Sequence, residues 1–177
     1  MNPRWRVLDG LPPYGAMPEQ FGATGQSMHR EGFVVAFSPS EAPMWVGNFQ
    51  RGSTSLDVVL VSRSDATVTV IAGGLAYVVD PGSRSCIRTF GDRIEQVFEL
   101  GDLAVFSNGL WMEATDGERI VWRTRRLSWD GMRNAHVDGE KIVGDAYDPM
   151  EDIWTRFTVD LATGEVEGGS YPPDLPT

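Results

Sequence analysis

The chain has 177 residues, of which 41% are hydrophobic and 23% are charged, as in one ordinary globular domain or two small ones. Its formal net charge is −10. No stretch approaches the ~18 consecutive apolar residues of a membrane helix. Cys86 is the single cysteine, which excludes an internal disulfide and a cysteine-rich metal site.

The first residues, Met1 to Arg6, include two arginines, but no apolar run follows them. A secretory signal is therefore not expected. Together with the lone cysteine, this favours a soluble protein of the reducing cytoplasm, with no membrane association and no cofactor.

The acidic charge is concentrated near the end of the sequence. From Asp130 onward there are eleven acidic residues and three basic ones, a net charge of −8, against −2 for residues 1–129. Such a segment argues against nucleic acid, because phosphates would be repelled. It favours a basic partner, a cation, or simple solubility.

The predicted elements begin with an irregular N-terminal arm, residues 1–32. Its glycines and prolines are too closely spaced for a long regular element. A short helical turn near Met17–Phe21 is the one regular element considered there, with Pro18 near its start. The aromatic residues Trp5, Tyr14 and Phe21 indicate that the arm packs on the body of the protein.

From Gly32 onward, short β-branched and aromatic runs alternate with turn residues, a pattern typical of strands. No apolar stripe with helical spacing lasts ten residues, and Glu95–Leu100 is the one run that a helix could claim. The expected strands up to residue 127 are Phe33–Ser38, Met44–Gln50, Leu56–Ser62, Thr67–Ala72, Leu75–Val79, Cys86–Phe90, Ile94–Leu100, Leu103–Ser107, Leu110–Thr115 and Arg119–Leu127.

The clearest strand pattern lies between Val137 and Gly169. Three turn signals divide this stretch, namely Asp138-Gly139, Asp148-Pro149 and Ala162-Thr163-Gly164. The runs between them predict an antiparallel meander of about four strands.

A cadence of four repeats runs through the sequence. Turns after a short apolar strand are predicted at Asn48, Asp80, Asp116 and Asp148, and each is followed by a returning strand. Trp45, Tyr77 and Trp111 should then occupy equivalent strands. This cadence resembles propeller blades, although a Trp-Asp dipeptide is missing, and a curled or sandwiched sheet would give the same cadence.

No catalytic constellation is recognisable. His29 and His136 lack a local partner that would orient them, and they are interpreted as surface or capping residues. Cys86 is expected to be an inert core thiol. Gly168-Gly169-Ser170 is interpreted as a turn, because no helix follows it. The basic patch of Arg119, Arg123, Arg125 and Arg126, beside Trp122 and Trp129, is expected to pair with the protein's own carboxylates.

The carboxylates of the predicted 148–149 turn are the best candidate for a site. Asp145, Asp148, Glu151 and Asp152, with Trp154, are predicted to form a partner-binding surface. A calcium site is disfavoured, because the spacing is not that of a calcium loop. A pair of glycosidase carboxylates is a further alternative. No catalytic or metal-binding residue is assigned.

The sequence thus predicts an all-β protein of antiparallel meanders in four hairpin-like repeats. The boundaries are an arm over 1–32, a single domain over 33–171 and a tail over 172–177. The functional hypothesis is a non-enzymatic protein of the inhibitor or immunity type, which presents its acidic end to a basic protein partner. The alternative is a small carbohydrate- or ion-binding pocket protein, or a hydrolase, that uses turn carboxylates and tryptophans.

Alternation within the strands also predicts a set of core residues. Those expected to be largely buried are Val58, Leu60, Val70, Val79, Ile87, Val105, Ile142 and Val159.

The secondary-structure prediction can be checked in solution. We expect more than about 40% strand and less than about 15% helix, because turn residues interrupt every run before a helix could form. Far-ultraviolet circular dichroism measures this composition, and a spectrum dominated by helix would contradict it.

Overall fold

The structure is a computed structural model. It describes residues 4–22, 30–40, 42–61, 67–117 and 119–175. These residues form sixteen strands and, within the described ranges, no helix, which confirms the all-β prediction. Glu95–Leu100, the run with an ambiguous pattern, contains a strand. Among the same residues, no helix has the length and apolar character needed to cross a bilayer.

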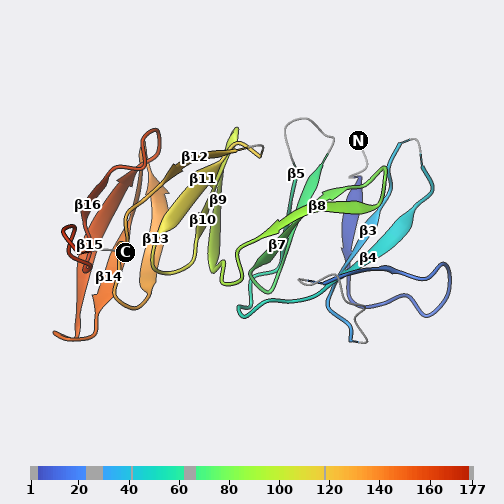
Figure 1. The fold of residues 1–177 in the computed structure, drawn as a ribbon, viewed down its shortest axis with the longest axis horizontal. Coiled ribbons are helices and arrows are strands. Elements are labelled where there is room, and N and C mark those ends of the chain that lie inside the picture. The colour runs from blue at the N-terminus through green and yellow to red at the C-terminus, as the bar shows by residue number, and fades with distance from the viewer. Residues whose placement is uncertain (1–3, 23–29, 41, 62–66, 118, 176–177) are drawn as a thin grey trace. The chain divides into compact units, whose positions relative to one another are not determined.

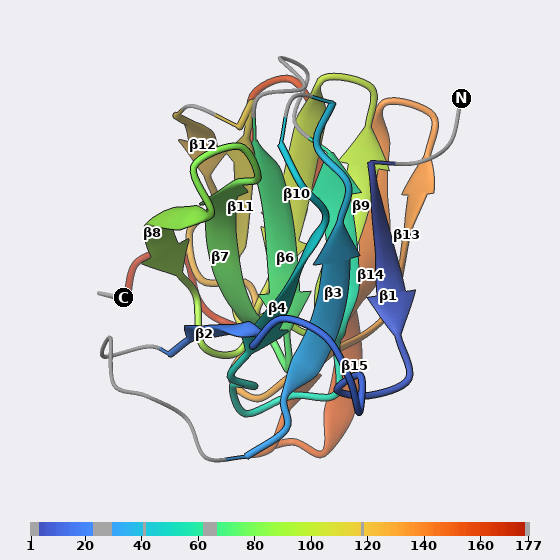
Figure 2. The same ribbon diagram turned by 90° about the vertical axis from the view of Figure 1, so that its right-hand side faces the viewer.

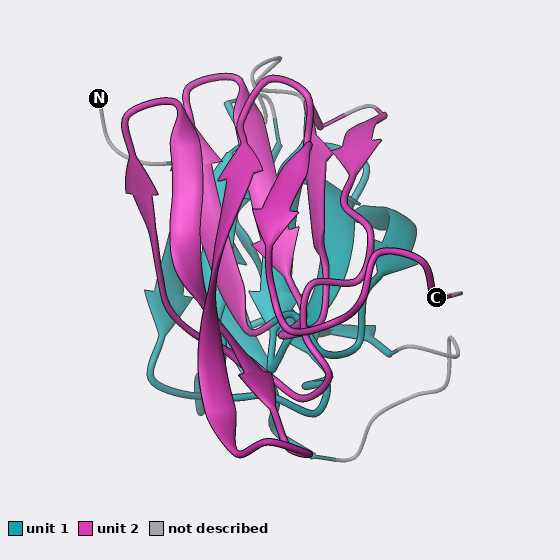
Figure 3. Cartoon of the chain, turned by 90° about the vertical axis from the view of Figure 1, so that its left-hand side faces the viewer, with its two compact units in different colours: residues 1–94 teal, residues 95–177 magenta. Residues whose placement is uncertain are grey.

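The chain divides into two compact units, residues 1–94 and 95–177, which Figure 3 colours separately. The predicted single domain over 33–171 includes parts of both, and each unit is described by itself. Each unit contains two four-stranded sheets that are largely antiparallel and do not close into a barrel (Figure 1).

Unit 1 holds the first sheet, in the order β1-β3-β4-β2, and the second sheet, in the order β5-β6-β7-β8. Their strands are β1 (Trp5–Leu8), β2 (Glu19–Phe21), β3 (Phe33–Phe37), β4 (Trp45–Phe49), β5 (Val58–Val61), β6 (Val68–Ala72), β7 (Leu75–Asp80) and β8 (Ser85–Phe90).

Unit 2 holds the third sheet, in the order β9-β10-β11-β12, and the fourth sheet, in the order β13-β14-β15-β16. Their strands are β9 (Gln96–Leu100), β10 (Leu103–Ser107), β11 (Met112–Thr115), β12 (Ile120–Arg123), β13 (Met132–Asp138), β14 (Lys141–Asp148), β15 (Ile153–Asp160) and β16 (Val166–Gly168).

The N-terminal arm is more regular than predicted. β1 pairs antiparallel with β3, and β2 pairs parallel with β4 (Figure 2), so Glu19–Phe21 is a strand and not a helical turn. Trp5 and Phe21 pack against the core of unit 1, as expected of an arm that lies on the body. Glycine and proline mark where short segments end, but they do not show that such a segment pairs with a strand some thirty residues later.

Asn48, predicted as a turn residue, lies inside β4 and is 1% exposed. Its side-chain amide donates to the Gln20 side chain and to the carbonyl oxygen of Arg30, and its side-chain oxygen accepts from the backbone N–H of Gly32 at 2.7 Å. A buried amide is stable here because all of these groups are satisfied. The prediction was wrong because asparagine serves a tertiary hydrogen-bond network here and not a local turn.

The three aspartate turns of the predicted cadence are confirmed. Asp80 ends β7, Asp148 ends β14, and Asp116 follows β11. Each side chain accepts a hydrogen bond from a backbone N–H two or three residues later, which replaces a backbone turn contact. Asp160 does the same at the end of β15, and these backbone donors hold its pKa below the usual value.

The equivalence of the aromatic residues follows from the strand orders. Trp45 lies in β4, Tyr77 in β7, and Trp111 directly before β11. Each of these strands is third in its sheet when counted from β1, β5 or β9. The repeat is therefore present in the backbone, although its first turn was misplaced.

Each unit has its own apolar core, formed by residues from both of its sheets. In unit 1 the rings of Phe37 and Trp45 stack at 4.4 Å between centroids. Tyr77 is fully buried and donates its hydroxyl proton to the carbonyl oxygen of Gln50 at 2.8 Å. Burial raises the pKa of Tyr77 to about 12, because the phenolate would lose its hydration.

Six of the eight predicted core residues are buried. They are Leu60, Val70, Val79, Val105, Ile142 and Val159. Val58 is half-buried at the edge strand β5. Ile87 is wrong, since its side chain is 59% exposed. Its neighbour Cys86 packs on the core, and successive side chains in a strand point to opposite faces, so Ile87 points away.

A matched pair of substitutions tests this assignment. Leu60→Ala should lower the free energy of unfolding by about 2–5 kcal/mol, because it leaves a cavity. Ile87→Ala removes an aliphatic side chain of the same size from an exposed position and should cost less than about 0.5 kcal/mol. Equilibrium denaturant melts measure both changes. Equal losses in the two variants would show that the faces of β5 or β8 are misassigned.

Candidate functional site

The predicted site residues lie on the hairpin of β14 and β15 in the fourth sheet (Figure 1). Ile142, Ala146, Phe157 and Val159 place one face of this hairpin in the core of unit 2. Because side chains alternate between faces, Asp145 and Tyr147 lie on the opposite face of β14. The antiparallel register pairs Tyr147 with Trp154, on that same face.

Tyr147 and Trp154 form a cross-strand aromatic pair. Their ring centroids are 4.9 Å apart and the ring planes are inclined by 34°. Aromatic pairs opposite each other on neighbouring strands stabilise a hairpin and hold both rings in place. Trp154 remains 37% exposed, so the pair presents an apolar surface to solvent.

A guanidinium group covers part of this aromatic surface. The guanidinium carbon of Arg133, on β13, lies 4.0 Å from the centre of a Trp154 ring. The Nε of Arg133 is 3.5 Å from a carboxylate oxygen of Asp145, and the side-chain amide of Asn134 donates to the same oxygen at 3.0 Å. The term aromatic site is used below for Arg133, Asp145, Tyr147 and Trp154.

The structure divides the predicted carboxylates between two places. Asp145 belongs to the aromatic site, whereas Asp148, Glu151 and Asp152 lie in the loop between the strands and are called the acidic turn. Asp148 accepts from the backbone N–H of Met150 at 2.9 Å, so the turn role expected of it is present. Glu151 is exposed.

Asp152 joins the two places. Its backbone has a φ of 53°, a left-handed conformation that aspartate tolerates better than most residues. Its carboxylate accepts the hydroxyl proton of Tyr147 at 2.7 Å. This hydrogen bond, with smaller contributions from desolvation and from the charges of Asp152, Asp130 and Asp148, raises the pKa of Tyr147.

The acidic turn also carries apolar side chains. Met150 is 69% exposed and Ile153 is 50% exposed, on either side of Glu151 and Asp152. Large apolar side chains that stay in solvent beside an aromatic pair are typical of a surface that contacts another molecule.

Sequence reasoning missed three members of this surface, namely Tyr147, Arg133 and Asn134. Tyr147 could have been found, because a turn centred after Asp148 sets the register that pairs it with Trp154. Arg133 and Asn134 could not, since the pairing of β13 with β14 shifts between Arg133 and His136, and Asn134 adopts a positive φ of 55°. Such a bulge changes which side chains face the neighbouring strand.

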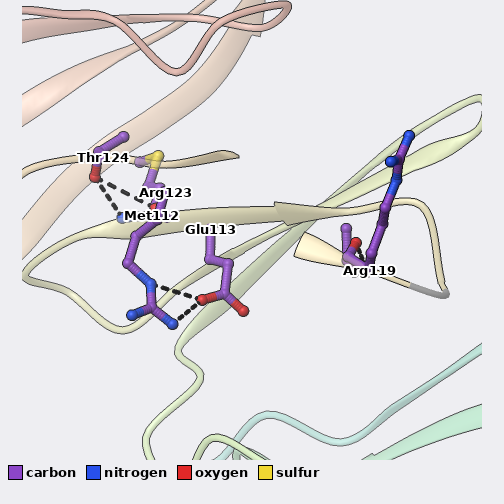
Figure 4. Close-up of polar contacts among 6 residues, drawn as sticks. Met112, Glu113, Arg119, Arg123 and Thr124 are labelled. Atoms are coloured by element: carbon purple, nitrogen blue, oxygen red, sulfur yellow. Dashed lines mark hydrogen bonds and ion pairs between the residues drawn. The ribbon is translucent and has the colours of Figure 1, made fainter. Parts of the chain in front are cut away.

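The four arginines of the basic patch all have partners within the chain. Arg123 pairs with Glu113, as Figure 4 shows, and lies 4.8 Å over the ring of Trp111. Arg119 pairs with Asp116. Arg125 and Arg126 donate instead to backbone carbonyl oxygens, among them those of Gly168 and Trp129. Pairing with carboxylates is thus confirmed for two of the four.

The remaining candidates are accounted for locally. Burial raises the pKa of the Cys86 thiol, which is the opposite of what a nucleophile requires. The Nδ1 of His136 lies 2.8 Å from the carbonyl oxygen of Asn134. His29 lies outside the described residues. Among the residues that are described, no three His, Cys, Asp or Glu side chains gather as a metal ion would need.

The sequence matches no protein-family model and no curated protein. Two solved structures resemble parts of the chain. "Crystal structure of Kluyvelomyces marxianus Hsv2" is 11% identical, with a TM-score of 0.41 over 77% of this chain and 44% of that one. "Crystal structure of the eukaryotic initiation factor" is 6% identical, with a TM-score of 0.41 over 78% and 40%. The chain spans less than half the length of either.

The hydrogen bond between Tyr147 and Asp152 gives a direct test of the site. Asp152→Asn removes the negative charge that holds the phenol proton, so the pKa of Tyr147 should fall toward the usual value near ~10. Nuclear magnetic resonance of ¹³C-labelled tyrosine during an alkaline titration measures this pKa.

Glu151→Gln is the matched control, because it removes the same charge one residue away without touching the tyrosine. Its effect on the pKa of Tyr147 should be the smaller of the two. An unchanged pKa in Asp152→Asn would contradict the hydrogen bond.

Proposed function

We propose that the protein is a non-enzymatic binding protein of the inhibitor or immunity type, which works in the cytoplasm and docks a basic protein partner at the aromatic site and the acidic turn. The observation that carries the proposal is the exposed pair of Tyr147 and Trp154 beside the carboxylates of the acidic turn. Tyrosine, tryptophan and arginine are the residue types that dominate the binding energy of protein interfaces.

The charges of this region support a basic partner. Asp130, Asp148 and Asp152 all act electrostatically on Tyr147, so their fields add at one place on the surface. The segment from Asp130 onward has a net charge of −8. A concentrated negative field speeds the approach of a positive partner and repels nucleic acid.

Each part of the surface would have a distinct role. The aromatic pair supplies rigid apolar area that loses little conformational entropy on binding. Met150 and Ile153 extend that area, whereas the surrounding carboxylates select for arginine and lysine on the partner.

The alternative, a carbohydrate-binding pocket or hydrolase, would need tryptophans gathered beside the turn carboxylates. Trp45 and Trp122 are buried, and Trp129 packs on Tyr171 at 4.4 Å. Trp154 is beside the predicted carboxylates, but Arg133 lies over its ring. These observations favour the protein-binding proposal.

Charge reversal at the acidic turn tests the proposal. A partner is first captured with the wild-type chain, and its association rate constant is then measured over a series of salt concentrations. Glu151→Lys should slow association and flatten its salt dependence, because it weakens the steering field, which salt screens over about 8 Å at physiological strength. The fold should persist, since Glu151 is exposed.

Glu140→Lys is the matched control. Glu140 lies between β13 and β14, at the opposite end of β14 from the acidic turn, and its reversal changes the net charge equally. It should slow association less than Glu151→Lys does. Equal rates for both variants and the wild type would show that these carboxylates serve solubility alone.

A further inference from the structure

Arg133 is held at the aromatic site by two weak contacts. Its side chain is 50% exposed, and only its Nε lies within ion-pair distance of Asp145, at 3.5 Å. An arginine that bound the carboxylate with both ends of its guanidinium fork would make a stronger and more directional contact. An exposed pair of this length contributes little to stability.

The site itself is held more firmly than its occupant. The indole of Trp154 is fixed by the cross-strand stack with Tyr147, whose hydroxyl is in turn fixed by Asp152. Asp145 is held by the donor group of Asn134 at 3.0 Å. If the Arg133 side chain moved away, an aromatic face and a carboxylate would remain in place beside each other.

We infer that Arg133 is an intramolecular stand-in for an arginine side chain of the partner, which displaces it from Trp154 and Asp145 when the complex forms. The inference rests on the proposed function and deepens it, because it names the partner's anchoring group. A planar guanidinium can lie flat on an indole and reach a carboxylate at its edge, as Arg133 does, whereas a lysine ammonium is a compact, strongly hydrated charge.

Displacement agrees with the distribution of charge around the site. Asp148, Glu151 and Asp152 lie at the end of β14 nearer Tyr147, whereas Arg133 contacts Asp145, further along the strand. An incoming arginine would therefore approach through the negative field of the acidic turn before it reaches Trp154. The partner's arginine adds the rest of its interface, which Arg133 cannot supply.

The test uses N-acetyl-arginine methylamide as the probe and the full chain as the protein. Nuclear magnetic resonance follows the indole N–H signal of Trp154, which is assigned by its loss in Trp154→Phe. In Arg133→Ala the vacated site should bind the probe about threefold to tenfold more tightly than the wild type does. N-acetyl-lysine methylamide should bind Arg133→Ala more weakly than the arginine probe.

Arg156→Ala is the matched control, because Arg156 is the cross-strand partner of Asp145 on β15 and its loss changes the net charge equally. It should not increase binding of the arginine probe as Arg133→Ala does. Adding Asp145→Asn to Arg133→Ala should reduce the gain. An unchanged amide spectrum elsewhere shows that each variant is folded, and Arg133→Lys offers a milder replacement if Arg133→Ala is not.

Two results would overturn the inference. One is equal binding of the arginine probe to the wild type and Arg133→Ala, and the other is equal binding of the arginine and lysine probes to Arg133→Ala. If either occurs while Glu151→Lys still slows association of the captured partner, the docking surface stands and only the displacement fails. If the probe binds as expected but Glu151→Lys has no effect, the arginine site stands and the proposed steering fails.

Discussion

The register of the β14–β15 hairpin is the constraint on which the candidate site depends. In a strand pair the side chains alternate between faces, so a shift of one residue would turn Tyr147 and Trp154 into the core and bring Ala146 and Phe157 to the surface. Two interactions at the turn oppose such a shift. Asp148 accepts from the Met150 backbone, and Asp152, in a left-handed conformation, accepts from the Tyr147 hydroxyl.

The same carboxylates serve both structure and recognition. Asp152 closes the turn and orients Tyr147, yet its charge also contributes to the negative field around that ring. Asp145 anchors Arg133 and Asn134 while it lies beside an exposed indole. A surface of this kind is held in shape before a partner arrives, which lowers the entropic cost of binding.

Short, local patterns were predicted well from the sequence. An aspartate at a strand end can close its own turn with nearby backbone N–H groups, so Asp80, Asp116 and Asp148 could be placed without knowledge of the rest of the fold. Asn48 has similar chemistry but was misplaced, because its hydrogen-bond partners come from Gln20, Arg30 and Gly32, far away in the sequence. Ile87 was misplaced because the neighbouring Cys86 takes the core side of β8.

The sequence by itself determined the all-β class, the hairpin cadence, most of the core and the acidic character of the last 48 residues. These properties depend on composition, on alternation and on turns whose contacts are local. Only the tertiary structure decided that Arg133 meets Trp154 and that the carboxylates divide between two places. The physical reason is the bulge in β13, because one irregular residue in a strand changes which side chains face the next strand, and no local pattern announces it.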